Sequence, residues 1–298
     1  MTGTVATVGT FDGIHRGHQA VLAEIVRRAR ARGLPSLLVT FEPHPLEVVN
    51  PSAAPRLLTL PDEKRAAVEA LGVERVEVVP FTPALARLGP EEFVRSVLRT
   101  RFAMEELVLG YDHGFGRGRS GDVELVRRLA REDGFTVDVV AAVTEAGQAI
   151  SSSLVRTAVA HGDLAAAERW LGRSYGVRGV VERGAGRGRT IGTPTLNLAS
   201  LDPRKLLPPD GVYAVRVTWP GAGASYGGMM NQGPRPTFGV HERGLEIHLF
   251  DFSGELYGKM VTVEWVRWLR EVQTFPSRQA LVDQIERDAQ AARAILNR

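Results

Sequence analysis

The sequence predicts an α/β domain built on a mostly parallel sheet, followed by a small antiparallel β-barrel and a terminal helix. Over roughly the first 170 residues, short apolar runs alternate with stretches of helical spacing, which is typical of βα units. From Tyr175 the helical spacing vanishes for about a hundred residues, and short β-rich runs separated by Gly/Pro turns replace it. We therefore place a boundary at Gly172 to Tyr175 and expect domains at residues 1–174 and 175–298.

The N-terminal half is expected to alternate strand and helix. The expected strands are residues 5–8, 37–41, 76–80 and 107–109, and a further apolar run covers residues 137–143. The expected helices are residues 19–33, 61–72, 89–101, 151–162 and 163–171. In such sheets ligands bind beyond the carboxyl ends of the strands, so the turn after the first strand is the first place to look for a site.

That turn is the segment from Gly9 to His18, GTFDGIHRGH, which lies between the first strand and the first helix. Its glycines let backbone approach a ligand closely, and a helix start favours anions. His15 and His18 can donate hydrogen bonds to charge that develops during phosphoryl or nucleotidyl transfer. Two histidines in the pattern H-x-G-H, between a strand and a helix, favour a functional role over that of ordinary polar residues in a loop. With neither H-E-x-x-H nor cysteine, zinc is not expected.

Two further polar segments follow apolar runs of the same half. Residues 110–122 contain several glycines and two arginines, so they are either a flexible loop or a ligand lid that wraps a nucleotide. The serines from Ser151 to Ser153 predict a helix N-cap. The same arrangement presents hydroxyls, helix-start amides and Arg156 to a polyphosphate.

The C-terminal half carries a second set of polar groups on β-rich sequence. The expected strands are residues 177–182, 212–219, 225–231, 245–252 and 260–269, before a Ser-capped helix over residues 277–297. Residues 184–197 form a Gly/Arg-rich segment that is either a hairpin loop or a phosphate-binding loop. Thr195 and Asn197 share one face of a strand, and their oxygens suit Mg²⁺ alongside ATP phosphates. Glu246, in an apolar strand, is either a surface carboxylate or a base that accepts a hydroxyl proton.

Composition excludes several classes of protein. The chain is 44% hydrophobic and 24% charged, which is typical of a globular protein and not of a disordered one. The sequence contains no run of about twenty apolar residues, so no membrane span is predicted. It also contains no cysteine, which excludes disulfide bonds and thiolate catalysis. The net charge of +3 comes from arginines dispersed among acidic residues, without a basic run or RNA-binding motif. We expect a soluble, cytoplasmic protein that binds neither nucleic acid nor membrane.

Several separated motifs occur together and in order. They are GTFDGIHRGH at 9–18, FEPHP at 41–45, the segments 110–122 and 151–156, TPTLN at 193–197, GVY at 211–213, LEIH at 245–248 and LYGK at 256–259. With this set the chain resembles the prokaryotic bifunctional riboflavin kinase / FMN adenylyltransferase (FAD synthetase) family over essentially its whole length. The resemblance implies a Rossmann-like nucleotidyltransferase domain of the HIGH type and a riboflavin kinase-like barrel.

The resemblance implies two sequential reactions. In the barrel, riboflavin attacks the γ-phosphate of ATP to give FMN, with Glu246 as base and Thr195 and Asn197 as ligands of Mg²⁺ and ATP. In the N-terminal domain, FMN attacks the α-phosphate of a second ATP to give FAD, with His15 and His18 as catalytic residues. The further residues implied in ATP binding are Gly9, Phe11, Asp12, Gly17, Ser152, Arg156, Gly188 and Thr193. Those implied in flavin binding are Asp112, Phe115 and Arg189.

Some positions depart from the family's usual residues. Tyr111 and His113-Gly114 replace the more common acidic residue and Phe-Arg around Asp112, which affects the expected flavin contacts of that loop. Ser153 stands where threonine is usual, Thr193 replaces a frequent aromatic residue, and Gln232 replaces a frequent isoleucine. The changes at Thr193 and Gln232 are expected to alter the affinity of the kinase for its substrates, but none of these departures removes a group that does chemistry.

Two other classes of protein compete with this interpretation. A different H-x-G-H nucleotidyltransferase, such as a class I aminoacyl-tRNA synthetase or a cytidylyltransferase, explains the histidines but gives the barrel no role, and the Lys-Met-Ser-Lys-Ser motif is missing. A non-catalytic nucleic-acid or flavin-binding module would use the barrel as an OB-like platform. Its mark would be exposed aromatic residues beside basic ones, for which Trp219, Trp265 and Trp268 are the candidates.

Overall fold

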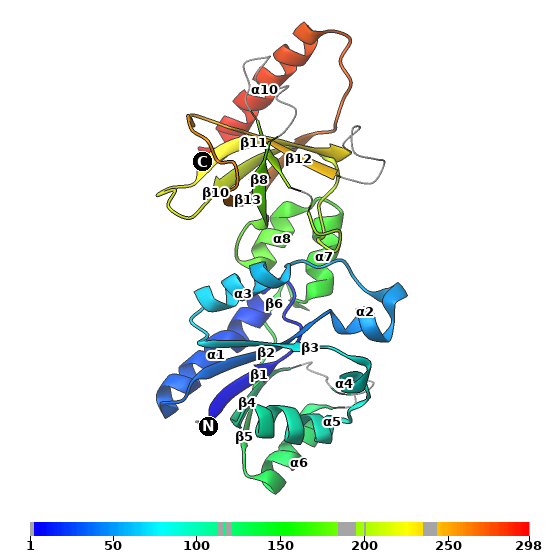
Figure 1. Cartoon of the computed structure of the whole chain (residues 1–298), viewed down its shortest axis with the longest axis vertical. Helices are drawn as coiled ribbons and strands as arrows, with labels where there is room; N and C mark the ends of the chain where they lie inside the picture. The colour runs from blue at the N-terminus through cyan, green and yellow to red at the C-terminus, as the bar shows by residue number, and fades with distance from the viewer. Residues whose placement is uncertain are drawn as a thin grey trace. The chain divides into compact units, whose positions relative to one another are not determined.

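The computed structural model describes residues 3–111, 116, 121–183, 195–199, 201–234 and 243–297 (Figure 1). The chain divides into two compact units, Met1–Val155 and Arg156–Arg298. This division assigns residues 156–174 to the second unit, whereas the change in sequence pattern places them in the first domain. The domain boundary at 174/175 therefore stays a prediction.

The N-terminal unit is built on a five-stranded parallel sheet. Its strands are β1 (Thr4–Val8), β2 (Ser36–Glu42), β3 (Arg75–Pro80), β4 (Met104–Gly110) and β5 (Thr136–Val140). Their order is β3-β2-β1-β4-β5, and every neighbouring pair is parallel. The predicted α/β fold is confirmed. The strand order reverses between β1 and β4, and ligands of such sheets bind at this switch point, where the turn from Gly9 to His18 leaves β1.

Helices follow most of the strands. They are α1 (Arg16–Arg32), α2 (Pro45–Val49), α3 (Pro61–Ala70), α4 (Pro83–Arg87), α5 (Pro90–Glu92), α6 (Val123–Asp133) and α7 (Ser152–Ala160), with a 3₁₀ turn η1 (Pro51–Ala53) and a π-helix η2 (Phe93–Arg101). A small hairpin joins β6 (Thr144–Glu145) to β7 (Gln148–Ala149). The helix expected over residues 89–101 thus has π-type hydrogen bonds over most of its length, because apolar spacing over nine residues does not separate π from α periodicity.

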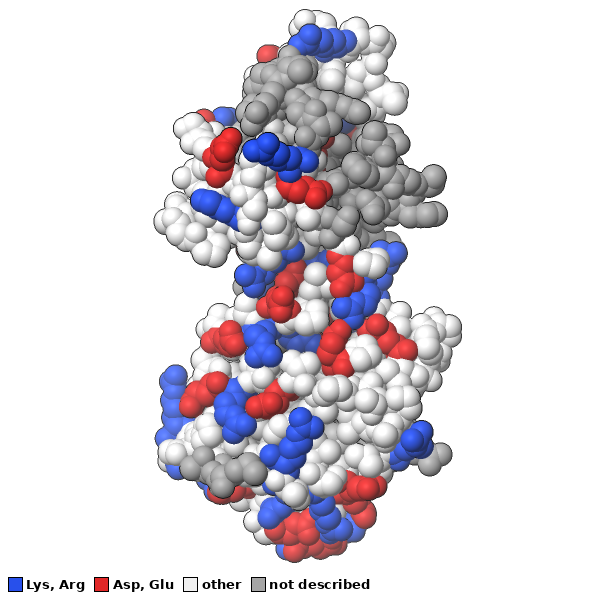
Figure 2. Space-filling view, in the orientation of Figure 1, with Lys and Arg blue, Asp and Glu red and all other residues white. Residues whose placement is uncertain are grey.

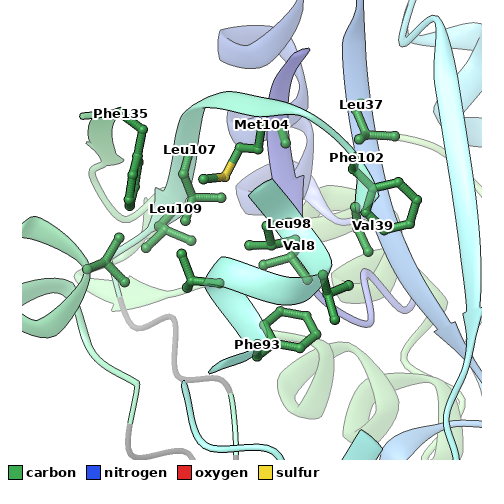
Figure 3. Packing of buried hydrophobic residues seen from close by; sticks show 14 of the residues in the cluster. Val8, Leu37, Val39, Phe93, Leu98, Phe102, Met104, Leu107, Leu109 and Phe135 are labelled. Atoms are coloured by element: carbon green, nitrogen blue, oxygen red, sulfur yellow. The ribbon is translucent and has the colours of Figure 1, made fainter. Parts of the chain in front are cut away.

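The sheet buries both of its faces, as the near-continuous apolar strands require. Leu38 and its neighbours in β1 and β4 pack against α1 and α3. Leu37 and Val39, which alternate with Leu38, pack on the opposite face against η2 and α6. Figure 3 shows this second cluster, with Phe93 and Leu98 of η2 facing the strands. Alternate side chains of β2 therefore pack against two separate layers of helices, one on each face of the sheet.

A network of ion pairs joins α1 to strands β4 and β5 of the sheet. Glu106 of β4 is 4% exposed, and its carboxylate accepts hydrogen bonds from Arg28 at 2.5 Å and Arg32 at 3.1 Å. Arg28 also pairs with Glu24 and with Asp138 of β5. The buried carboxylate thus depends on two guanidinium groups of one helix.

Replacing Arg28 with methionine is expected to lower the free energy of unfolding by about 1–3 kcal/mol, because a buried carboxylate then loses one of its two charged partners. Arg27→Met is the matched control, since Arg27 pairs with Glu24 on the exposed side of the same helix. Because solvent screens an exposed pair of this kind, Arg27→Met is expected to leave the free energy of unfolding almost unchanged. Urea unfolding followed by circular dichroism measures both variants, and equal losses would contradict the role given to Glu106.

The C-terminal unit contains a closed antiparallel barrel. Its elements are α8 (Leu164–Leu171), β8 (Tyr175–Glu182), β9 (Leu196–Leu198), β10 (Gly211–Thr218), β11 (Tyr226–Pro234), β12 (Arg243–Leu249), β13 (Met260–Arg270) and α10 (Arg278–Leu296). The six strands close in the order β10-β11-β12-β9-β8-β13, and all pairs are antiparallel. The predicted barrel and terminal helix are confirmed. Ser277 caps α10 by accepting the backbone N–H of Ala280, as predicted.

Alternation along β12 separates the inside of the barrel from its outer face. Leu245, Ile247 and Leu249 are buried, whereas Glu246 and His248 are half-buried. Phe250, in phase with Glu246 and His248, packs in an outer cluster with Ala214, Met229 and Ala292 of α10. Glu246 therefore lies on the outer face of the barrel, the face on which α10 also packs.

Candidate functional site

The turn after β1 ends in a histidine N-cap. His15 has an extended backbone, and its Nδ1 accepts a hydrogen bond of 3.3 Å from the backbone N–H of His18. Accepting this bond requires a lone pair on Nδ1, so the neutral ring carries its proton on Nε2. His15 is only 5% exposed. The cap thus fixes both the place of the ring and the nitrogen that can donate to a ligand.

The two predicted histidines are brought together. Their rings stack with centroids 3.7 Å apart, and the ring of Phe11 lies 4.7 Å from that of His18. A Cβ at Gly17 would lie 3.1 Å from two atoms of the His15 ring, which is closer than nine in ten real Cβ contacts. A side chain at position 17 would therefore displace the His15 ring by a few tenths of an ångström.

The backbone of this turn is strained and firmly held. Phe11 and Ile14 have φ of 46° and 44°, in the left-handed region that costs a non-glycine residue about 1–3 kcal/mol. Asp12 is 1% exposed, and its carboxylate accepts the backbone N–H groups of Leu58 and Thr59 at 2.9 and 2.8 Å and the hydroxyl of Thr59 at 3.0 Å. Strain retained by a buried network is typical of functional turns. The buried carboxylate of Asp12 therefore holds this strained backbone in place.

The start of α7 meets the same turn. Ser151 caps α7 by accepting the N–H of Leu154, which confirms the predicted N-cap, and the hydroxyl of Ser152 donates to the carbonyl of Asp12 at 2.9 Å. Gly9, at the end of β1, donates its N–H to Val39 of β2. Arg156 follows Ser152 by four residues on α7, so the two share one face of that helix.

Lys64 is a charged neighbour of this turn that the sequence analysis did not identify. Its ammonium donates to the hydroxyl of Thr40 at 3.4 Å. Burial lowers the pKa of Lys64, and the carboxylates of Asp12 and Glu42 act in the opposite direction. One available signal was composition, because in this arginine-rich chain lysine stands only at Lys64, Lys205 and Lys259.

The second predicted cluster lies on the outer face of the barrel. The hydroxyl of Thr195, just before β9, donates to a carboxylate oxygen of Glu246 at 2.7 Å. Asn197 of β9 and Glu246 of β12 are direct partners in the strand pairing. Three residues from segments about fifty positions apart are thus brought together, as the resemblance implied.

This cluster fits a magnesium ion that arrives with a nucleotide. The oxygens of Thr195 and Asn197 are hard, neutral donors beside the carboxylate of Glu246, and such donors suit Mg²⁺. Among the described residues, no group of three or more His, Asp or Glu side chains is placed to hold a metal ion. Mg²⁺ at this cluster would therefore take much of its coordination from phosphate oxygens and water.

Some of the predicted site residues do not lie in the part of the chain that the structure describes. Asp112, Phe115, Gly188, Arg189 and Thr193 lie outside the described residues.

Gln232, which stands where isoleucine is frequent, is fully buried in the barrel. Its amide nitrogen donates to the carbonyls of Pro208 and Pro209 at 2.6 and 3.1 Å, and its oxygen accepts the indole N–H of Trp265 at 3.0 Å. The buried amide is hydrogen-bonded at both ends, so this departure is accommodated inside the barrel.

Of the three tryptophans named as candidates for a nucleic-acid platform, only Trp268 is exposed. Trp265 is 1% exposed and belongs to the core, and Trp219 stacks on Tyr226; Trp268 is 42% exposed. On the face shown in Figure 2, basic and acidic side chains are interspersed over the N-terminal unit. In the part of the chain that the structure describes, no helix is sufficiently long and apolar for a transmembrane segment.

Comparison with known families matches both halves of the chain. The model of the FAD synthetase family matches residues 1–154, and the model of the riboflavin kinase family matches residues 171–296. The two matches include the histidine turn and the Thr195–Glu246 cluster, respectively. The sites built from the sequence therefore fall one in each matched segment.

Curated relatives are similar over nearly the whole chain. The bifunctional riboflavin kinase/FMN adenylyltransferase of Pseudomonas fluorescens is 41% identical, over 98% of this chain and 93% of the relative. Proteins of the same name from Escherichia coli K12 and Bacillus subtilis are 38% and 36% identical, over 92% and 91% of their lengths. A solved structure from Streptococcus pneumoniae, named a macrolide-efflux protein, matches with a TM-score of 0.86 at 32% identity, over 98% of this chain and 95% of that one. The chain belongs to the bifunctional riboflavin kinase/FMN adenylyltransferase family.

Proposed function

We propose that the chain makes FAD from riboflavin in two ATP-dependent steps, each at its own site. The chain has riboflavin kinase and FMN adenylyltransferase activities, and we assign the kinase to the Thr195–Glu246 cluster and the adenylyltransferase to the histidine turn. The observation that carries this assignment is that the two family matches fall on consecutive segments, each containing one of the two clusters. A cytoplasmic location, with riboflavin, FMN and ATP as partners, is part of the proposal.

In the kinase step, Glu246 is the base. Its carboxylate accepts the proton of the riboflavin 5′-hydroxyl while that oxygen bonds to the γ-phosphorus of ATP, and the bond from this phosphorus to ADP breaks. Thr195 donates to one carboxylate oxygen, so it orients Glu246 and leaves the other oxygen for the substrate. Thr195 and Asn197 would hold Mg²⁺ together with the phosphates of ATP, and the ion would supply charge neutralisation. Gly188 and Thr193 are proposed to bind ATP here, and Arg189 the flavin.

In the adenylyltransferase step, no protein nucleophile is needed. A phosphate oxygen of FMN bonds to the α-phosphorus of ATP, and the bond to pyrophosphate breaks. His15 and His18 are proposed to donate hydrogen bonds to the charge that develops on the triphosphate, His15 through Nε2. Ser152 and Arg156 are proposed to bind the polyphosphate from α7, and the glycines Gly9 and Gly17 allow its close approach. Asp112 and Phe115 are proposed to contact the flavin.

A time course with riboflavin, ATP and Mg²⁺ tests this proposal directly. Chromatography is expected to show FMN first and then FAD at the expense of FMN. A parallel reaction started from FMN isolates the second step. FMN as the final product would contradict the adenylyltransferase assignment, and folded protein that gave neither flavin product would contradict both.

A further inference from the structure

The pairing of the barrel strands places a polar residue on each side of Glu246. Glu246 of β12 pairs directly with Asn197 of β9 on one side and with Asn231 of β11 on the other. Asn197 in turn pairs with Glu182 of β8. Residues directly opposite in antiparallel strands project from the same face, with Cβ atoms about 4.5–5.5 Å apart. The outer face therefore carries a row of four polar side chains, Glu182, Asn197, Glu246 and Asn231.

The two sides of Glu246 are not equivalent. Thr195 and Asn197, the proposed ligands of Mg²⁺ and ATP, both lie on the β9 side. In phosphoryl transfer the attacking and leaving oxygens lie roughly in line, on opposite sides of the transferred group. An acceptor whose hydroxyl meets Glu246 thus approaches from the β11 side. The first side chain of the row on that side is Asn231.

Asn231 has the chemistry to bind an acceptor that carries several hydroxyls. It is exposed, and its side chain makes no hydrogen bond to the residues that the structure describes. An amide offers two N–H donors and a carbonyl acceptor, whereas each hydroxyl of a polyol both donates and accepts. Across β10 the next residue in the row is Val212, which is apolar and 6% exposed, so the polar row ends at Asn231.

We propose that Asn231 binds the hydroxyl-bearing ribityl chain of riboflavin on the β11 side of Glu246. This inference rests on the proposed kinase site and adds an acceptor-binding residue to it. Gln232, the next residue along β11, is not an alternative, because its amide is buried and hydrogen-bonded inside the barrel. The role of Asn231 concerns the acceptor and not the nucleotide.

Steady-state kinetics of Asn231→Ala tests the assignment. The KM for riboflavin is expected to rise about tenfold, because the variant loses one or two hydrogen bonds to the ribityl chain. The kcat and the KM for ATP are expected to change less than about threefold. The matched control is Thr262→Ala, which removes a half-buried polar side chain from β13, a strand that pairs with neither β11 nor β12. This control is expected to leave all three parameters unchanged.

Binding of lumiflavin, which keeps the ring system but lacks the ribityl chain, separates a polyol contact from a ring contact. Asn231→Ala is expected to leave its inhibition constant unchanged. Equal weakening of lumiflavin and riboflavin, a parallel rise in the KM for ATP, or an unchanged KM for riboflavin would each overturn the inference. If the unaltered protein failed to phosphorylate riboflavin, the proposed function itself would fail, so the two failures are distinguishable.

Discussion

Glu246→Gln is expected to lower the rate of riboflavin phosphorylation by about 10²–10⁴-fold, the usual contribution of a general base, while FAD formation from supplied FMN continues. The substitution keeps the size of the side chain and leaves a carbonyl oxygen that can accept the hydroxyl of Thr195. What it removes is the ability to accept the proton of the attacking hydroxyl. The measurement is the initial rate of each step, started from riboflavin or from FMN.

A second barrel carboxylate provides the control for this variant. Glu264 of β13 is half-buried, and its burial raises its pKa, although Arg216 and Arg173 oppose that effect. Glu264→Gln makes the same chemical change within the same barrel but away from β9 and β12, and we expect it to keep the kinase rate within about threefold. Comparable loss of phosphorylation in both variants would show that replacing a barrel glutamate by glutamine damages the barrel itself. A fully active Glu246→Gln variant would contradict the assignment of Glu246 as the general base.

The fold was largely predictable because its main signals are local and repeated. Five strands alternate with helices in the first half, and each period is readable over a window of 5 to 17 residues. Short helices were missed for the same reason, since α2 and α4 have five residues each. Five residues cover little more than one helical turn, so a helical period cannot be established from them.

In the candidate sites, contacts between residues close in sequence were predictable, whereas contacts between distant segments were not. His15 and His18 stand three positions apart at a helix start, so their proximity follows from local structure. Thr195 and Glu246 meet only because β9 pairs with β12, and the resemblance, not the spacing, linked them. Lys64 was missed because its contact with Thr40 joins residues 24 positions apart in the chain. Long-range pairing of this kind leaves no periodic trace in a sequence.

Replacing His15 and His18 together by asparagine is expected to lower FMN adenylylation by at least about 10²–10³-fold, the effect of losing one donor to developing charge. FMN should then accumulate from riboflavin at the normal rate. Asparagine is chosen because it can still cap α1, whereas alanine at His15 would also cost about 1 kcal/mol of stability. An unchanged melting temperature would therefore separate the loss of catalysis from the loss of the cap.

His161→Asn is the control for the histidine pair, because His161 is exposed, follows α7, and has its Nδ1 2.7 Å from the carbonyl of Thr157. Both activities should survive that change. If the double variant still made FAD from FMN, the stacked pair would not provide the donors assigned to it, and the strained turn that holds the pair would need another explanation. If the double variant lost phosphorylation as well, the two steps would not have separate sites. Accumulation of FMN with intact folding is the outcome that the separate sites require.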